Sequence, residues 1–329
     1  MLHKKTIFSF LILGVFLLVA VFLFLRNNWS SEIKNNNKPK VTASIFPIYD
    51  IVKKVAGEKI DVELILPPGA SPHTYEPKPS DIKKIQNSSA VFIAGHGLDL
   101  WVSNIIKDGN SVTIIPVDKN VTLKSYEEFE KINAVKSDNH TEDTHHNEHE
   151  ETDISHSHEG VDPHYYLSIK NGQLIAKQIS SELQILFPEF KNEILKNEKQ
   201  YLTELRKIEE EINSKISKVQ GKRIATFHNA WNYFAEELGV KVVATFEEYP
   251  GEEPTALYLK NFSEKIKDNK LKVVFTEPQF STKALLPIAK DLGVTIIEID
   301  PIGGLPERDS FIKLMKYNVL EIEKTLSNQ

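Results

Sequence analysis

The stretch from Glu189 to Val219 contains neither glycine nor proline, and this predicts one long, uninterrupted helix. At 1.5 Å per residue such a helix would be about 45 Å long, enough to brace two domains at once. A partnerless coiled-coil arm is the alternative, but the apolar stripe covers only about four heptads and drifts from a strict seven-residue spacing. The stripe recurs in steps of three, four and seven and comprises Phe190, Ile194, Tyr201, Leu205, Ile208, Ile212, Ile216 and Val219.

Length and composition limit the kinds of protein that this chain can be. A chain of 329 residues has room for two domains of ordinary size. A net charge of -6, with acids and bases interspersed, argues against a nucleic-acid partner. The chain has no cysteine, so histidine and carboxylates are the strong metal ligands available, and its 11 histidines are the compositional anomaly.

The N-terminal segment predicts export. Ile7 to Leu25 is a run of 19 uncharged, mostly apolar residues, about 28 Å as a helix and close to the thickness of a bilayer core. Lys4 and Lys5 precede it, which predicts an N-terminus inside and the rest of the chain outside. A cleaved signal peptide is the alternative, but the run exceeds a usual h-region and no small-x-small site follows, so an uncleaved anchor is expected. Residues 27–40 are polar and predict a flexible tether.

Two blocks with the same alternation of strands and helices follow. The first has strands expected at 41–47, 60–66, 89–95 and 111–117, and a helix that Ser80 would cap. The second has strands expected at 223–227, 240–246, 272–278 and 295–300. This alternation predicts an α/β protein of two lobes, each with a four-stranded parallel sheet flanked by helices. The predicted division is 1–40 for anchor and tether, 41–170 for the first lobe, 171–220 for connecting helices, and 221–329 for the second lobe.

A low-complexity insert interrupts the first lobe. Residues 138–158 contain six histidines, seven acidic residues and one aliphatic residue, so they cannot bury enough apolar surface to fold alone.

Four candidate metal ligands lie after strands or in the segment that joins the lobes. His73 follows the second strand, His164 lies just after the insert, and His228 and Asp300 directly follow strands of the second lobe. Ligands of parallel sheets bind beyond the carboxyl ends of the strands. Three imidazoles and one carboxylate suit Zn²⁺, and they would hold it in the cleft between the lobes. Each residue taken singly has an ordinary explanation: His73 as a surface histidine, His164 in a helix-start turn, His228 as a core histidine and Asp300 in a turn before proline. Taken together, the four residues are explained better by a shared site.

Several long motifs resemble one family, the metal-binding solute-binding proteins of ABC importers for zinc and manganese, also called cluster A-I. They are ASIFPIYDIVKKVAG, LPPGASPHTYEPKPSD, VDPHYYLS, FHNAWNYFAEELGV, EEYPGEEPTALYL, VVFTEPQFS and IDPIGG, and the resemblance covers the chain from Val41 onward. It implies that His73, His164, His228 and Asp300 are the metal ligands. It also implies a cargo-binding protein rather than an enzyme, working as a monomer with an ABC permease in the membrane.

Histidine at position 228 and the histidine-rich insert resemble the zinc-binding members, because manganese-binding members commonly have a glutamate at the third position. We therefore expect zinc, with manganese or iron as the alternative. The insert is interpreted as a low-affinity zinc collector, with a solvated spacer as the alternative. Glu76 and Glu277 match family motifs and are expected behind the ligands or in structural roles; His96 is at most an accessory residue.

The sequence departs from the family pattern in two places, and two other functions remain as alternatives. The lipobox cysteine of many members is absent, so anchoring would fall to the apolar segment, and DPHYYLSI replaces the usual sequence after the leucine. A zinc hydrolase is a rival function, although no HExxH spacing occurs. A surface adhesin is the other.

Overall fold

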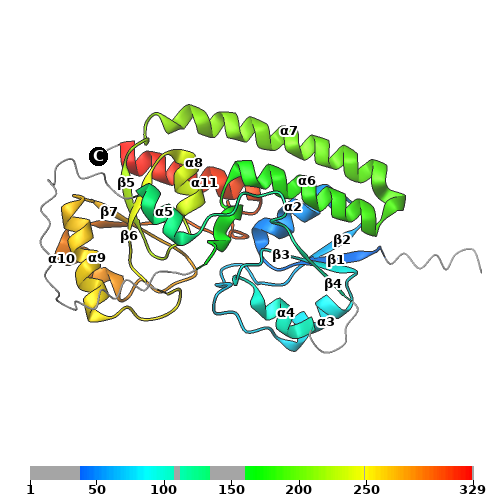
Figure 1. The fold of residues 1–329 in the computed structure, drawn as a ribbon, viewed down its shortest axis with the longest axis horizontal. Coiled ribbons are helices and arrows are strands. Elements are labelled where there is room, and N and C mark those ends of the chain that lie inside the picture. The colour runs from blue at the N-terminus through cyan, green and yellow to red at the C-terminus, as the bar shows by residue number, and fades with distance from the viewer. Residues whose placement is uncertain (1–37, 107–111, 134–159, 248, 328–329) are drawn as a thin grey trace, which may run out of the picture. The chain divides into compact units, whose positions relative to one another are not determined.

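Two four-stranded parallel sheets form the framework, as expected from the sequence, and the structure adds that both have the same strand order (Figure 1). The computed structural model describes residues 38–106, 112–133, 160–247 and 249–327. The first sheet has the order β2-β1-β3-β4 and the second the order β6-β5-β7-β8. The strands are β1 (Lys40–Ala43), β2 (Asp61–Leu64), β3 (Ala90–Ile93), β4 (Thr113–Pro116), β5 (Arg223–Thr226), β6 (Lys241–Thr245), β7 (Val273–Thr276) and β8 (Thr295–Glu298).

Helices follow the strands and cover the sheets. They are α2 (Phe46–Ala56), α3 (Pro79–Gln86), α4 (Leu100–Ile106), α5 (Tyr126–Asn133), α6 (Ile169–Leu186), α7 (Lys191–Ile216), α8 (Asn232–Leu238), α9 (Ala256–Asp268), α10 (Leu285–Leu292) and α11 (Phe311–Ser327), with 3-10 turns η1 (Pro163–Tyr166) and η2 (Pro188–Phe190). Among these described helices, none combines the length and apolar character that crossing a bilayer requires. The predicted anchor at 7–25 and the insert at 138–158 lie outside the described residues.

Two local predictions were wrong, both at helix starts. Phe46 and Pro47, expected at the end of a strand, form the first turn of α2, where proline fits because its missing N–H has no helical partner. Ser80 does not cap α3, which begins at Pro79. Instead Asp81, in the first turn, accepts the backbone N–H of Lys78 at 2.9 Å.

Helix α7 braces both lobes, but it is shorter than predicted because η2 precedes it and the helix ends at Ile216. It packs against α2 and α6 beside the first sheet and against α8 and α11 beside the second (Figure 1). The predicted apolar stripe faces this contact, with Leu202 as an additional buried member. Near the start of α7, Asn197 donates to the carbonyl of Val55 at 3.2 Å and so ties α7 to the end of α2.

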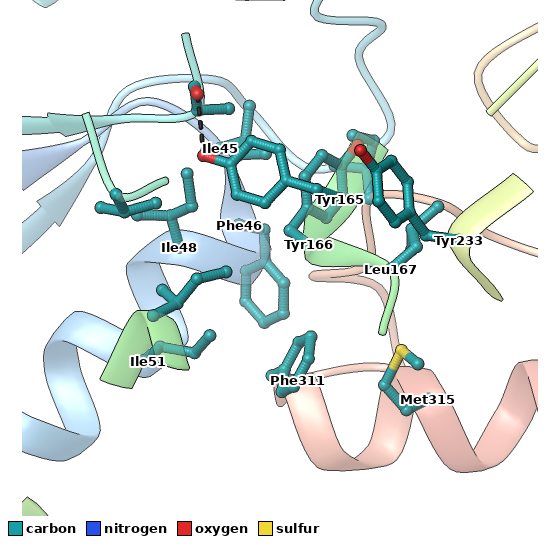
Figure 2. Close-up of a cluster of buried hydrophobic side chains, with 14 of the residues drawn as sticks. Ile45, Phe46, Ile48, Ile51, Tyr165, Tyr166, Leu167, Tyr233, Phe311 and Met315 are labelled. Atoms are coloured by element: carbon teal, nitrogen blue, oxygen red, sulfur yellow. Dashed lines mark hydrogen bonds between the residues drawn. The ribbon is translucent and has the colours of Figure 1, made fainter. Parts of the chain in front are cut away.

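A shared apolar core joins the lobes, and we call it the interlobe core. Its members include Ile45, Phe46, Tyr165, Tyr166, Phe311 and Met315, all at most 9 % exposed (Figure 2). The backbone N–H of Phe311, at the start of α11, donates to the buried carboxylate of Asp50 in α2 at 2.8 Å. Elements far apart in sequence are thus held together by apolar burial and by one buried hydrogen bond, which leaves little freedom for the lobes to separate.

Helix α5 packs against the second lobe although it precedes the insert. The rings of Phe129 and Tyr233 meet edge-on with centroids 4.8 Å apart, and the backbone N–H of Lys124 donates to the Tyr233 hydroxyl at 2.7 Å. Ser125 and Val161 form an antiparallel bridge, so the chain returns to its starting point after α5 and the insert. The predicted division at 41–170 and 221–329 remains a prediction.

A close contact in the interlobe core gives a stability prediction. A Cβ built on Gly172 in α6 would lie 2.6 Å from Cε1 of Phe311. Alanine in a helix normally gains about 1 kcal/mol over glycine, but overpacking costs about 1–3 kcal/mol. We expect Gly172→Ala to lower the free energy of unfolding by up to about 2 kcal/mol, measured by urea denaturation. Lys177→Ala, at an exposed position of the same helix, should change it by less than about 0.5 kcal/mol. A stabilised Gly172→Ala protein would refute the contact.

Candidate metal centre

Three of the four predicted ligands converge. His73, His164 and His228 each offer a nitrogen, and these nitrogens all lie within 4.8 Å of one another. The ring centroids are 5.3 to 5.4 Å apart for every pair, and Nε2 of His73 lies 3.2 Å from Nε2 of His164. The three ring centroids therefore form a nearly equilateral triangle.

The fold brings these histidines together from three separate segments. His73 lies in the loop between β2 and α3, His164 in the turn η1, and His228 two residues beyond β5. His164 and His228 are buried, with 1 % and 3 % of their surface exposed, while His73 is partly exposed. The carboxyl ends of parallel strands meet at one edge of each sheet, and those edges face the space between the lobes.

A carboxylate orients each of the two buried imidazoles. Nδ1 of His164 lies 2.8 Å from Oδ1 of Asp162, and Nδ1 of His228 lies 2.7 and 2.8 Å from the two carboxylate oxygens of Glu277. Trp231 also donates to Glu277 at 2.9 Å. A carboxylate at Nδ1 fixes the tautomer that carries its proton there and leaves Nε2 free to bind a cation.

Only one of the two carboxylate partners was predicted from the sequence. Glu277 was expected in such a supporting role. Asp162 was not singled out, although its position two residues before His164 was the available signal. The other expected supporting residue, Glu76, is exposed and forms none of the hydrogen bonds or ion pairs found in the described part of the chain.

Unpaired polar atoms gather around a small cavity at the centre of the triangle. The cavity holds about 10 Å³ of open space, close to the volume that a single water-sized sphere needs. Several of its lining residues have a buried polar atom without a hydrogen-bond partner in the described part of the chain, namely Ser71 Oγ, Tyr166 Oη, His228 Nε2 and Gln279 Oε1. Buried polar groups normally find partners, so this concentration indicates a place for a small polar ligand.

The structure does not bring Asp300 into the group of close ligand atoms, although its neighbours Pro301 and Ile302 line the cavity. Its Oδ1 accepts hydrogen bonds from Gln279 Nε2 and from the backbone N–H groups of Ile302 and Gly303, at 2.9 to 3.0 Å. Its Oδ2 lies 3.3 Å from Nη1 of Arg308. The fully buried carboxylate is thus engaged by its own loop and by a guanidinium.

The environment of His73 keeps its ring uncharged. Burial, and then the neighbouring His164 and His228 rings, lower its pKa well below the ordinary value of 6.5. An imidazole must be neutral to bind a metal. His73 is therefore ready to act as a nitrogen donor near pH 7, and such a donor suits a borderline divalent cation.

The family of the chain follows from comparison with known proteins. The model of the family described as zinc-uptake complex component A, periplasmic, matches residues 41–325. The chain belongs to the zinc-uptake complex component A family. That family was expected from the sequence motifs, and the match extends over both lobes.

The chain is also similar to individual known proteins and to solved structures. The zinc-binding protein AdcA of Streptococcus pyogenes is 27 % identical over 298 residues, covering 89 % of this chain and 56 % of AdcA. The chain thus spans about half the length of the curated relatives first matched. The metal ABC transporter substrate-binding lipoprotein SsaB of Streptococcus sanguinis is 27 % identical over 325 residues, covering 96 % of this chain and 98 % of SsaB. The crystal structure of ZnuA has a TM-score of 0.70 at 24 % identity, covering 89 % and 99 % of the two chains, and it shows the same fold.

The depressed pKa of His73 predicts a pH-dependent stability of the metal-free protein. In the unfolded chain His73 takes up a proton near pH 6.5, whereas in the folded chain it does so at lower pH. The unfolded state therefore binds more protons in this window, and stability falls as the pH drops below about 6.5. One such group contributes up to about 1.4 kcal/mol between pH 7.5 and 5.5.

The measurement is urea denaturation of the metal-free wild type beside His73→Gln at both pH values. Comparing the two proteins cancels the buried acids whose pKa values are raised, such as Asp50 and Asp99, because they are present in both. We expect the stability of the wild type to fall relative to that of His73→Gln on acidification. An equal pH dependence in the two proteins would contradict the prediction.

Proposed function

We propose that this chain is an extracytoplasmic zinc-binding protein that captures Zn²⁺ between its lobes and delivers it to an ABC permease. The observation that carries the proposal is the triangle of His73, His164 and His228 around a cavity of about 10 Å³. Zinc carried in this way is cargo, and it is not a cofactor for a reaction. The family described as zinc-uptake complex component A supports the same conclusion.

The distances support zinc. Zn–N bonds of about 2.0–2.1 Å in a tetrahedral arrangement place two ligand nitrogens about 3.3 Å apart. The separation of 3.2 Å between Nε2 of His73 and Nε2 of His164 is close to that value. These two ligands are therefore nearly at their metal-bound spacing, so that little rearrangement of this pair opposes binding.

The donor types favour zinc over manganese. Three imidazoles form a nitrogen-rich, softer set, whereas Mn²⁺ is better served by carboxylate and carbonyl oxygens. The relatives AdcA and SsaB are named for binding zinc and for a metal ABC transporter, respectively.

We assign the fourth position to Asp300. Its Oδ2 is buried and accepts no hydrogen bond in the described part of the chain, and residues on either side of the site, Gln279 and Ile302, connect it to the cavity. A carboxylate would neutralise part of the charge of the cation, and the ion would compete with Arg308, which lies 3.3 Å away, for Oδ2. A closed set of four protein ligands leaves no open position for a reactive water, which favours binding over hydrolysis.

The remaining parts of the chain fit delivery at a membrane. We assign the apolar segment 7–25 to anchoring the chain on the outer side of the plasma membrane. The histidine-rich insert 138–158 would collect zinc with many weak, interchangeable donors. The partner would be the permease, which takes the ion from the site, and the binding protein would work as a monomer.

The direct test is the zinc content of the purified protein. Wild-type protein should retain one tightly bound zinc per chain after dialysis, and His228→Ala should lose it, with affinity reduced by more than about 100-fold, because a ligand is lost and the Glu277 carboxylate behind it stays buried. Metal analysis and competition with a zinc chelator measure both quantities.

Deletion of residues 138–158 is the matched control. It should keep the tight zinc and lose only additional, weakly bound ions. Wild-type protein without tight zinc, or His228→Ala with undiminished affinity, would refute the proposed site.

The interlobe core predicts a small change of shape on zinc binding. The lobes share buried side chains and a hydrogen bond between α2 and α11, so capture should order loops near the site rather than close a wide hinge. Small-angle scattering of residues 39–329 with and without zinc should show no resolvable drop in radius of gyration. A large drop would contradict a rigid connection between the lobes.

A further inference from the structure

A second, larger cavity adjoins the three-histidine triangle. It has a volume of about 420 Å³, and we call it the vestibule. Two members of the triangle, His73 and His228, line both the vestibule and the inner cavity. The remaining vestibule lining includes His96, Tyr126, Asn229 and Pro250. An ion that reaches the triangle through the vestibule therefore passes these residues first.

The histidines of the described residues all lie on this path. They are His73, His96, His164 and His228, and each lines the inner cavity or the vestibule. His96 is not part of the triangle, and the proposed zinc site does not use it; its ring meets that of Tyr165 edge-on, with centroids 6.3 Å apart.

His96 repeats the arrangement of the buried ligands. One ring nitrogen, Nε2, lies 2.5 Å from Oδ2 of Asp118, just as Nδ1 of His164 and Nδ1 of His228 each meet a carboxylate. The other nitrogen, Nδ1, makes no hydrogen bond within the described residues. Both His96 and Asp118 remain partly exposed, at 27 % and 20 % of their side-chain surface. A carboxylate behind one nitrogen makes the other a stronger ligand.

The loop that carries His96 is firmly held. His96 has φ = 51°, in the left-handed region that a residue with a side chain rarely adopts. The buried carboxylate of Asp99 accepts the backbone N–H groups of Ala94 at 2.7 Å and Gly95 at 2.8 Å, and it also accepts the hydroxyl of Ser44 at 2.5 Å. These bonds offset the unfavourable conformation and keep His96 at the vestibule.

We propose that His96, with Asp118 behind it, is an entry site that binds Zn²⁺ transiently and passes it to the triangle. This inference rests on the proposed function. At the entry site Nδ1 of His96 replaces one water of the hydrated ion, and the imidazoles of His73 and His228 then replace others as His96 is released. No bond other than these metal–ligand bonds forms or breaks. A single imidazole binds zinc weakly, so the ion does not stay there.

The entry site has a defined kinetic consequence. A transient site lowers the barrier in both directions, so it speeds zinc binding and zinc release by the same factor and leaves the dissociation constant unchanged. Mixing the metal-free full chain in detergent with zinc chloride in a stopped-flow instrument measures the binding rate. The fluorescence of Trp231 is a local reporter, because its indole N–H donates to Glu277, the partner of His228.

Three variants separate ligation from structure. His96→Gln places an amide Nε2 where the imidazole contacts Asp118, so it keeps the hydrogen bond and the charge but removes the strong ligand. We expect zinc binding and release to slow by about 3- to 10-fold, with one zinc per chain and an unchanged dissociation constant. His96→Cys restores a strong ligand without that hydrogen bond and should recover most of the rate. Asp118→Asn removes the supporting carboxylate and should also slow binding.

The outcomes that overturn the inference are specific. A wild-type rate in His96→Gln or in Asp118→Asn would exclude an entry site. Equal slowing in His96→Gln and His96→Cys would assign His96 a structural role instead. The comparison is repeated without residues 138–158, so that the six insert histidines offer no alternative first contact. If only the entry site is wrong, the wild-type protein still retains its tightly bound zinc. If the proposed function is wrong, the wild-type protein has no tightly bound zinc.

Discussion

The interlobe core is the contact on which the metal centre depends. His73 belongs to a loop of the first lobe and His228 to the second, yet their rings must stay within about one ångström of a common arrangement to share an ion. Phe46 and Phe311 are buried in that core, and α7 packs along both lobes behind it. The stability of the fold and the spacing of the imidazoles thus have one cause. Packing in the interlobe core holds the imidazole nitrogens in place, so that these nitrogens are already arranged before a cation arrives.

The distribution of charge around the site follows the same logic. The side chains that face the cavity include three imidazole rings, and the acids beside two of them, Asp162 and Glu277, lie behind the rings at Nδ1. In the absence of a cation the centre is therefore free of the repulsion that a ring of bare carboxylates would create. The inner surface thus offers nitrogen, and the carboxylates stand behind it.

The sequence predicted the two sheets and the bracing helix because glycine, proline and apolar periodicity are local signals. It missed α5, a short charged segment whose folding depends on contact between Phe129 and the distant Tyr233. His73 and His228 were predicted because strand ends of parallel sheets converge, and His164 was predicted from its place in the segment that joins the lobes. The detailed geometry of Asp300 was beyond sequence reasoning, since its partners are backbone N–H groups of its own loop and a guanidinium from Arg308. Such contacts depend on three-dimensional geometry rather than on spacing along the chain.

The bridge between Ser125 and Val161 has a consequence for the segment that it encloses. It closes the base of the excursion that contains α5 and the insert, and the backbone N–H of Asp162 donates to the carbonyl of Lys124 at 3.0 Å beside it. Each doubling of the length of such a closed loop costs only about 0.6 kcal/mol. The segment between the two bridged residues can therefore change in length at small entropic cost while His164, which follows it, keeps its place.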